Sequence, residues 1–110
     1  MSGSTLSTHV LDAALGRPAV GVEVVLSTLD GAELERGVTD DDGRLRLDAA
    51  APLAPGAYRL RFATGPWFAA QQRTTLFPLV ELAFEVAPDQ PHHHLALLLS
   101  PFAYTTYRGS

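Results

Sequence analysis

The C-terminal stretch 91–110 constrains the fold of this chain most strongly. Two extended runs, 92–99 and 102–107, flank a Ser-Pro break, and the second is rich in aromatic residues and threonine. Side chains alternate between the faces of a strand. One face of the first run therefore carries Leu95, Leu97 and Leu99, and the other carries His94, Ala96 and Leu98. This pattern predicts a β-hairpin with a leucine core face and a histidine on its opposite face.

The same alternation recurs in short runs along the rest of the chain. Strands are predicted over 6–11, 20–26, 33–39, 44–47, 58–62 and 80–86. Turn residues separate several of them, at Gly16-Arg17-Pro18, Asp30-Gly31 and Asp40 to Gly43. One helix is predicted over 65–73, where Pro66 suits a first helical turn. Seven or eight short strands with one short helix predict an all-β sandwich.

Length and composition exclude several classes of protein. One hundred and ten residues fit one domain, 1–110, with residues 1–5 expected to be a flexible segment. The net charge of −4 with eight basic residues argues against binding to nucleic acid. No apolar run reaches membrane-spanning length, and no signal peptide pattern is present. The absence of cysteine excludes disulfides and thiolate metal sites, and we expect a cytoplasmic protein.

Three ionisable residues lie on the strand faces opposite the leucines: His9, Arg44 and His94. Imidazoles exchange protons near neutral pH, and a guanidinium can orient an anionic or carbonyl-rich substrate. Together they would suffice for water-mediated acyl chemistry without a metal or cofactor. The residues meet only if their strands share a sheet, which spacing alone leaves open. Taken one at a time, each is more often a solvated surface residue.

Other motifs offer weaker alternatives. The run His92-His93-His94 suggests a metal site, but the middle ring points to the opposite face and zinc normally needs a third protein ligand. The acidic run 40–42 lacks the ligand spacing of a calcium loop. Ser100 has no nucleophile-elbow motif around it. A frayed terminus is the ordinary expectation for 107–110.

Three separated motifs nevertheless occur together, in order: His9-Val10-Leu11-Asp12 followed by Gly16-Arg17-Pro18-Ala19, the segment Thr39 to Arg44, and the C-terminal pattern ending in Tyr107-Arg108-Gly109-Ser110. With these motifs the chain resembles the transthyretin-related 5-hydroxyisourate hydrolases over roughly residues 8–110. The resemblance implies a transthyretin-like β-sandwich. It also implies an enzyme that hydrolyses a cyclic amide of 5-hydroxyisourate, a product of urate oxidation, to 2-oxo-4-hydroxy-4-carboxy-5-ureidoimidazoline.

The resemblance also implies which residues act. The catalytic group would be His9, Arg44, His94 and Ser110, with His94 favoured as general base, Arg44 as oxyanion stabiliser and Ser110 positioning water or substrate. The substrate-binding group would be Tyr107, Arg108, Gly109, Leu11, Ala96 and Leu98. Members of the family form homotetramers, dimers of dimers with sites at the dimer–dimer interface, and need no metal or cofactor. Which histidine is the base stays open.

The chain departs from the family pattern at His93, Leu95 and Ala96, where Tyr, Val and Pro are common, and at Ala103, where Gly is common. Ala96 lies on the proposed site face, so the shape of the pocket would differ there. Two alternatives on the same fold therefore remain. One is a protein that binds small aromatic ligands without catalysis, as transthyretin does, and the other is an inactive structural homologue.

Overall fold

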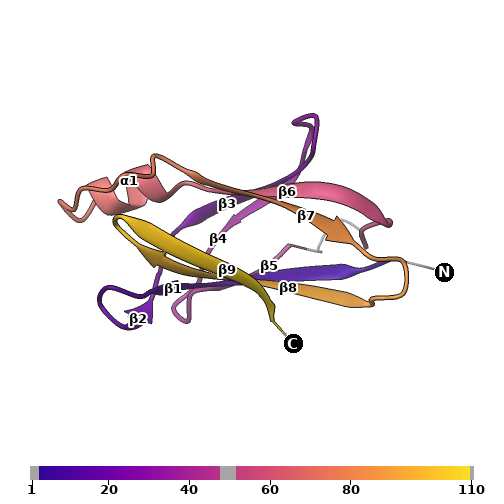
Figure 1. Cartoon of the computed structure of the whole chain (residues 1–110), viewed down its shortest axis with the longest axis horizontal. Coiled ribbons are helices and arrows are strands. Elements are labelled where there is room, and N and C mark those ends of the chain that lie inside the picture. Colours follow the sequence, from indigo (N-terminus) through magenta and orange to yellow (C-terminus); the bar gives the residue numbers. More distant parts are fainter. Residues whose placement is uncertain (1–2, 48–51, 110) are drawn as a thin grey trace.

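Two β-sheets pack face to face in the computed structural model, which describes residues 3–47 and 52–109 (Figure 1). In chain order the elements are β1 (Thr5–Asp12), β2 (Arg17–Pro18), β3 (Glu23–Thr28), β4 (Glu33–Val38), β5 (Arg44–Arg46), β6 (Gly56–Phe62), α1 (Thr64–Ala69), β7 (Val80–Val86), β8 (His92–Ser100) and β9 (Ala103–Gly109). One sheet has the order β2-β1-β8-β9, with β5 also paired to β1, and the other has the order β4-β3-β6-β7. The predicted all-β sandwich with one short helix is confirmed.

Period-two alternation explains how the core forms. The inward residues of the β1 and β8 sheet include Leu6, Val10, Leu97 and Leu99, each fully buried. They meet the inward residues of the other sheet, Val24, Leu60 and Phe62, in one hydrophobic cluster. Full burial of such a side chain contributes about 1.5–3 kcal/mol. The outward faces of the first sheet are thereby free to carry polar side chains.

Strand pairing around β1 positions those outward side chains. β1 and β8 run parallel, so that Ser7 lies beside His94 and His9 beside Ala96. On its other side β1 pairs antiparallel with β5, which sets His9 opposite Arg44. Residues that pair directly across neighbouring strands point to the same face. Segments from both ends and the middle of the chain therefore contribute to one surface.

A buried ion pair secures the end of β1. Asp12 is 1% exposed, and its Oδ2 accepts a hydrogen bond of 2.8 Å from Arg73 Nη1. Burial alone would raise the pKa of this carboxyl, but the bonds from Arg73 and from the backbone of Leu15 outweigh it and lower the pKa. The guanidinium of Arg73 also lies 4.8 Å from the centre of the Phe68 ring. The pair thus ties the helical corner to the sheet that carries the site.

Three local predictions are wrong in detail. Val20 is 47% exposed, and strand β3 begins only at Glu23, because Gly21 turns the chain with a φ of 85°. Arg17 and Pro18 form strand β2 against β1, and the turn lies before them. The helix spans Thr64–Ala69 and is shorter than expected.

No helix within 3–47 and 52–109 is long and apolar enough to cross a membrane.

Ser4 and Thr5, at the end of the N-terminal segment next to β1, are part of the regular structure. Residues 1–5 were predicted to be flexible, but Thr5 is the first residue of β1. Ser4 is 1% exposed and forms a β-bridge with Leu53. Residues 1 and 2 lie outside the described residues. The backbone bonds of Ser4 and the buried ring of His93 beside it explain the difference.

Candidate active site

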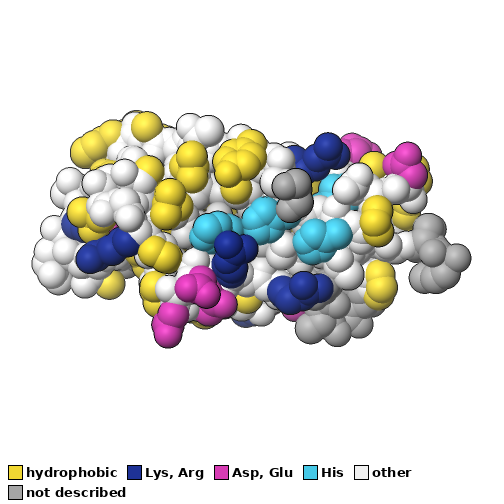
Figure 2. Space-filling model, turned by 90° about the horizontal axis from the view of Figure 1, so that it is seen from below, with side chains coloured by type: hydrophobic (Ala, Val, Ile, Leu, Met, Phe, Trp, Pro, Cys, Tyr) yellow, Lys and Arg dark blue, Asp and Glu magenta, His cyan; other side chains and the backbone are white. Residues whose placement is uncertain are grey.

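His9, Arg44 and His94 converge on the outer face of the first sheet. The rings of His9 and His94 lie with their centres 6.5 Å apart, and Arg44 pairs with His9 across β1 and β5. Figure 2 shows histidine side chains in a row on this face, with arginine side chains beside the row. The three strands named by sequence thus share a sheet and a face, as the site required.

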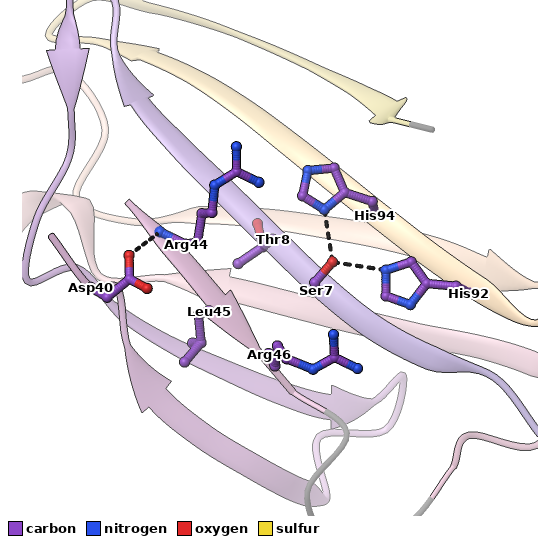
Figure 3. Close-up of a pocket in the computed structure, with 8 residues that line it drawn as sticks. All are labelled: Ser7, Thr8, Asp40, Arg44, Leu45, Arg46, His92 and His94. Atoms are coloured by element: carbon purple, nitrogen blue, oxygen red, sulfur yellow. Dashed lines mark hydrogen bonds between the residues drawn. The ribbon is translucent and has the colours of Figure 1, made fainter. Parts of the chain in front are cut away.

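A cavity of about 450 Å³ opens on this face (Figure 3). Its lining comes from β1, the turn before β5, β5 itself and β8: Ser7, Thr8, Asp40, Arg44, Leu45, Arg46, His92 and His94. Arg44 reaches over β1 from one side, Arg46 lies alongside β1 on that same side, and His92 and His94 reach toward it from the other. A small planar molecule with carbonyl groups would meet cations on one side and imidazoles on the other.

Ser7 is a member of the site that the sequence reasoning missed. Its Oγ lies 2.8 Å from His94 Nδ1 and 2.9 Å from His92 Nε2, and so connects the two rings (Figure 3). His92 had been weighed only as a metal ligand. The signal was present in the alternation, since Ser7 shares a face with His9 and His92 shares one with His94. The parallel register that joins the two pairs could not be seen in the sequence.

The turn before β5 holds Arg44 in place. Asp40 Oδ1 accepts hydrogen bonds of 2.9 Å from the backbone N–H groups of Asp42 and Arg44. The bond from Arg44 is the largest cause of the lowered pKa of the Asp40 carboxyl, ahead of the opposing effect of burial. Gly43 has a φ of 75°, and a Cβ there would lie 2.3 Å from the carbonyl oxygen of Val10. Only glycine therefore lets this turn approach β1 so closely.

The electrostatics of the cavity favour a neutral His94. Burial lowers the pKa of this imidazole, and electrostatic interaction with His9, Arg44 and His92 lowers it further. A neutral imidazole at physiological pH has one ring nitrogen with a free lone pair. His94 is therefore equipped to accept a proton, while the nearby guanidinium can stabilise negative charge.

Most of the other residues predicted for the site lie on the same face as His94, and Arg108 lies on the opposite face. Those on the same face as His94, by their strand pairing, are Leu11, Ala96, Leu98, Tyr107 and Gly109. A Cβ on Gly109 would lie 2.5 Å from His94 Cδ2, so this glycine leaves space for the ring. Ser110 lies outside the described residues.

The structure does not bring Arg108 into the cluster. It pairs with Leu95 and hence points to the opposite face of the sheet from His94. There it lines a separate cavity of about 360 Å³ between β7 and β9, together with His93 and Glu85, and Tyr107 contributes to the edge of the same cavity. The sequence reasoning grouped Arg108 with Tyr107 and Gly109 as a motif, but alternation along a strand separates it from both.

His93 has a structural environment of its own. It is 4% exposed, and its Nδ1 lies 2.7 Å from the hydroxyl of Ser4. Its Nε2 accepts a hydrogen bond of 3.3 Å from the backbone N–H of Ala87. Burial lowers the pKa of His93, and the charges of Arg108 and His92 lower it further. In this neutral form the ring joins β8 to the N-terminal segment and to the end of β7.

The His92-His93-His94 run does not assemble into a cluster of metal ligands. Across residues 3–47 and 52–109, no group of three or more His, Cys, Asp or Glu side chains could hold a metal ion. His93 lies on the other face, and the rings of His92 and His94 are bridged by Ser7. The polar residues of this face are arranged around hydrogen bonds.

Comparison with known proteins places the fold and the site in a family context. The family model described as the HIUase/Transthyretin family matches residues 6–109. The 5-hydroxyisourate hydrolase of Caulobacter vibrioides is 46% identical over 117 residues, which cover 100% of both chains. The structure of Klebsiella pneumoniae 5-hydroxyisourate hydrolase gives a TM-score of 0.90 at 44% identity, over 97% of this chain and 99% of that one. Sea bream transthyretin in complex with thyroxine gives a TM-score of 0.83 at 35% identity, over 94% of this chain and 93% of the other.

Proposed function

The chain belongs to the HIUase/Transthyretin family, and we propose that it is a 5-hydroxyisourate hydrolase. The reaction opens the ring of 5-hydroxyisourate at a cyclic amide and gives 2-oxo-4-hydroxy-4-carboxy-5-ureidoimidazoline. The single observation that carries this proposal is the convergence of two imidazoles and one guanidinium beside a cavity. Relatives named for this activity, matched over 96–100% of this chain, support it.

The mechanism follows from the positions of these groups. The lone pair of the His94 imidazole takes a proton from water as the water oxygen bonds to the amide carbonyl carbon. The carbonyl oxygen becomes an oxyanion, which Arg44 stabilises. The carbonyl then re-forms as the ring C–N bond breaks, and the proton on His94 passes to the leaving nitrogen. One water is added, and no other reactant is needed.

The remaining groups bind and orient the substrate in this proposal. His9 lies within the same cluster and completes the proton network around His94. Tyr107, Leu11, Ala96 and Leu98 would contact the substrate from the same face. Ser110 is assigned its role in positioning water or substrate from the sequence alone. Arg108 is left out of this set because it pairs with Leu95, on the opposite face of the sheet from His94.

We propose a homotetramer in which two dimers bring their site faces together. The site face carries partly exposed apolar groups beside the polar cluster, including Tyr107 at 54% exposure. Apolar surface next to an open cavity favours burial by a partner. A second copy of the chain on this face would narrow the cavity and exclude water from the substrate. A cytoplasmic location, a single domain over 1–110 and independence of any cofactor stay predictions from the sequence.

A carrier of small aromatic molecules is the second candidate. It is favoured by the likeness to sea bream transthyretin, whose structure contains thyroxine. The two candidates differ in turnover. A carrier would bind a thyroxine-like ligand and leave the decay rate of 5-hydroxyisourate unchanged.

The test is the decay of freshly generated 5-hydroxyisourate, followed by ultraviolet absorbance. We expect the wild-type protein to accelerate the decay above the spontaneous rate. A variant that ends at Gly109 and a His9→Asn variant should both lose most of that acceleration. A wild-type rate equal to the spontaneous rate would overturn the hydrolase assignment, and thyroxine binding would then be measured. Full activity in both variants would remove Ser110 and His9 from the site.

A further inference from the structure

Hydroxyl groups and imidazole rings alternate along the seam between β1 and β8. Thr5 Oγ1 is hydrogen-bonded to His92 Nδ1, and His92 Nε2 lies 2.9 Å from Ser7 Oγ. Ser7 Oγ in turn lies 2.8 Å from His94 Nδ1 (Figure 3). The parallel register, with Thr5 beside His92 and Ser7 beside His94, produces this order. The result is a continuous chain of hydrogen bonds that ends at the ring proposed as general base.

The hydrogen bonds of Thr5, at the other end of this series, determine which atom donates and which accepts at each step. Thr5 Oγ1 also lies 3.4 Å from the carbonyl oxygen of Pro91, and a carbonyl oxygen can only accept a hydrogen bond. When Thr5 donates to that carbonyl, it accepts from the Nδ1–H of His92. A neutral imidazole has one N–H, so His92 Nε2 must then accept from the Ser7 hydroxyl. The hydroxyl has a single hydrogen and therefore accepts from the Nδ1–H of His94.

We propose that Ser7 and His92 are positioning residues that hold His94 in the tautomer protonated at Nδ1, with the lone pair of Nε2 available to the cavity. This inference rests on the proposed role of His94 as general base and adds the reason why that ring has the correct tautomer. The hydrogen bond made by one ring nitrogen decides the state of the other. Ser7 and His92 act through His94.

The surroundings of the ring agree with a neutral, oriented base. The charged or ionisable groups around His94 are His9 on β1, Arg44 on β5 and His92 on β8, and each disfavours a second proton on the ring. Gly109 on β9 lies so close to the ring edge that a Cβ there would be 2.5 Å from His94 Cδ2. The hydrogen bond from Nδ1 to Ser7 therefore acts on a ring that is neutral and closely bordered by β9.

The test reads the tautomer directly, in the absence of substrate. Nitrogen-15 chemical shifts of the histidine rings distinguish a protonated from an unprotonated nitrogen. At pH 8 we expect wild-type His94 to be protonated at Nδ1 and unprotonated at Nε2. Ser7→Ala should give a mixture of tautomers. His92→Phe should reverse the preference, because the Ser7 hydroxyl then has only His94 Nδ1 as acceptor.

Kinetics supply the second readout. At metal sites, removal of the group that orients a ligating histidine lowers affinity or activity by about 10- to 100-fold, and Ser7 orients His94 in the same way. We expect a loss of this size in kcat for Ser7→Ala, with KM unchanged, and recovery of tautomer and kcat in Ser7→Thr, which keeps the hydroxyl. Ser27→Ala removes a buried hydroxyl from the other sheet and serves as the matched control, with wild-type shifts and rates.

The two proposals fail in different ways. Wild-type His94 protonated at Nε2, or an unchanged tautomer and kcat in Ser7→Ala, would overturn the positioning role. Absence of hydrolysis by the wild type would overturn the proposed function, and the chemical shifts would still report whether Ser7 and His92 set the tautomer.

Discussion

Adjacent histidines on the two faces of strand β8 lie in different surroundings. His94 lies on the outer face, beside the cavity, where its Nδ1 contacts the Ser7 hydroxyl. His93 lies on the inner face, 4% exposed, where it contacts Ser4 and accepts a hydrogen bond from the backbone of Ala87. Burial lowers the pKa of both rings. A shifted pKa therefore does not separate the two histidines, but their surroundings do: His94 shares its cavity with Arg44 and Ser7, whereas both ring nitrogens of His93 are engaged by Ser4 and Ala87.

If the two histidines differ in this way, replacement of His94 should lower the activity more than any other substitution. His94→Asn removes the group proposed to accept the proton from water, and general base catalysis contributes about 10²- to 10⁴-fold. We expect a loss of kcat in that range with little change in the free energy of unfolding. Enzymatic decay of 5-hydroxyisourate and urea denaturation measure the two quantities. A His94→Asn protein with wild-type kcat would remove His94 from the chemistry.

Arg44→Lys tests the other half of the outer face. Lysine keeps the positive charge but loses the planar fork of the guanidinium. Loss of one donor to a developing oxyanion costs about 10²- to 10³-fold in kcat, and we expect Arg44→Lys to approach the lower end. Arg61→Lys is the matched control, since Arg61 is paired with Glu81 on the other sheet and should leave kcat unchanged. Equal losses in both variants would contradict a specific role for Arg44.

Gly109→Ala perturbs the outer face without removing a polar group. Its methyl group would lie 2.5 Å from His94 Cδ2, so the ring must turn away from its position. A misplacement on this scale costs up to about 10²-fold in rate. Gly31→Ala provides the contrast, because Gly31 has a φ of 97° in a turn with no atoms near its Cβ. We expect that variant to lose stability and keep kcat, and unchanged kcat in Gly109→Ala would show that the ring does not depend on this contact.

A substitution on the inner face of β8 should lower the stability of the protein and leave its activity unchanged. His93→Leu leaves the N–H of Ala87 without its acceptor and removes the ring partner of Ser4. An unsatisfied buried polar group costs about 1–3 kcal/mol, so we expect a loss of that size in the free energy of unfolding at unchanged kcat. Ser4→Ala should cost less, because the ring keeps its bond to Ala87. A His93→Leu enzyme with wild-type stability but reduced kcat would reverse the comparison.

The smallest expected effect is on the pH dependence of the stability. An unfolded histidine has a pKa near about 6.5, and the folded chain lowers the pKa of His93 below that value. Above pH 6.5 the stabilisation is fully present; as pH falls, the unfolded chain binds protons that the folded chain rejects, and stability is lost. We expect wild-type stability to fall as the pH drops below about 6.5, and His93→Leu to show a shallower fall. The residual slope in that variant comes partly from His94, and identical slopes in both proteins would contradict the assignment to His93.

Much of the fold could be predicted because each strand alternates between apolar and polar residues. The hairpin of β8 and β9, with Leu95, Leu97 and Leu99 facing inward, follows directly from that pattern and is confirmed. The shared face of His9, Arg44 and His94 followed as soon as their strands were placed in one sheet. Local periodicity says which face a residue occupies.

Register between strands lies beyond local periodicity. The sequence does not show that β1 pairs parallel to β8 with Ser7 beside His94. For that reason Ser7 and the hydrogen-bond partners of His92 were missed. Arg108 was misplaced because a motif was read as one unit across a strand whose side chains alternate. His93 had no explanation from the sequence, since its partner Ser4 comes from the other end of the chain and its partner Ala87 meets it only through the turn between β7 and β8.

The most direct test compares the two neighbouring histidines in one experiment. The decay of freshly generated 5-hydroxyisourate is measured with wild type, His93→Leu and His94→Asn, at a temperature where all three are folded by circular dichroism. The account predicts that His93→Leu retains the wild-type rate and that His94→Asn falls close to the spontaneous rate. Loss of activity in His93→Leu with retention in His94→Asn would contradict it, because the chemistry would then lie on the inner face of β8.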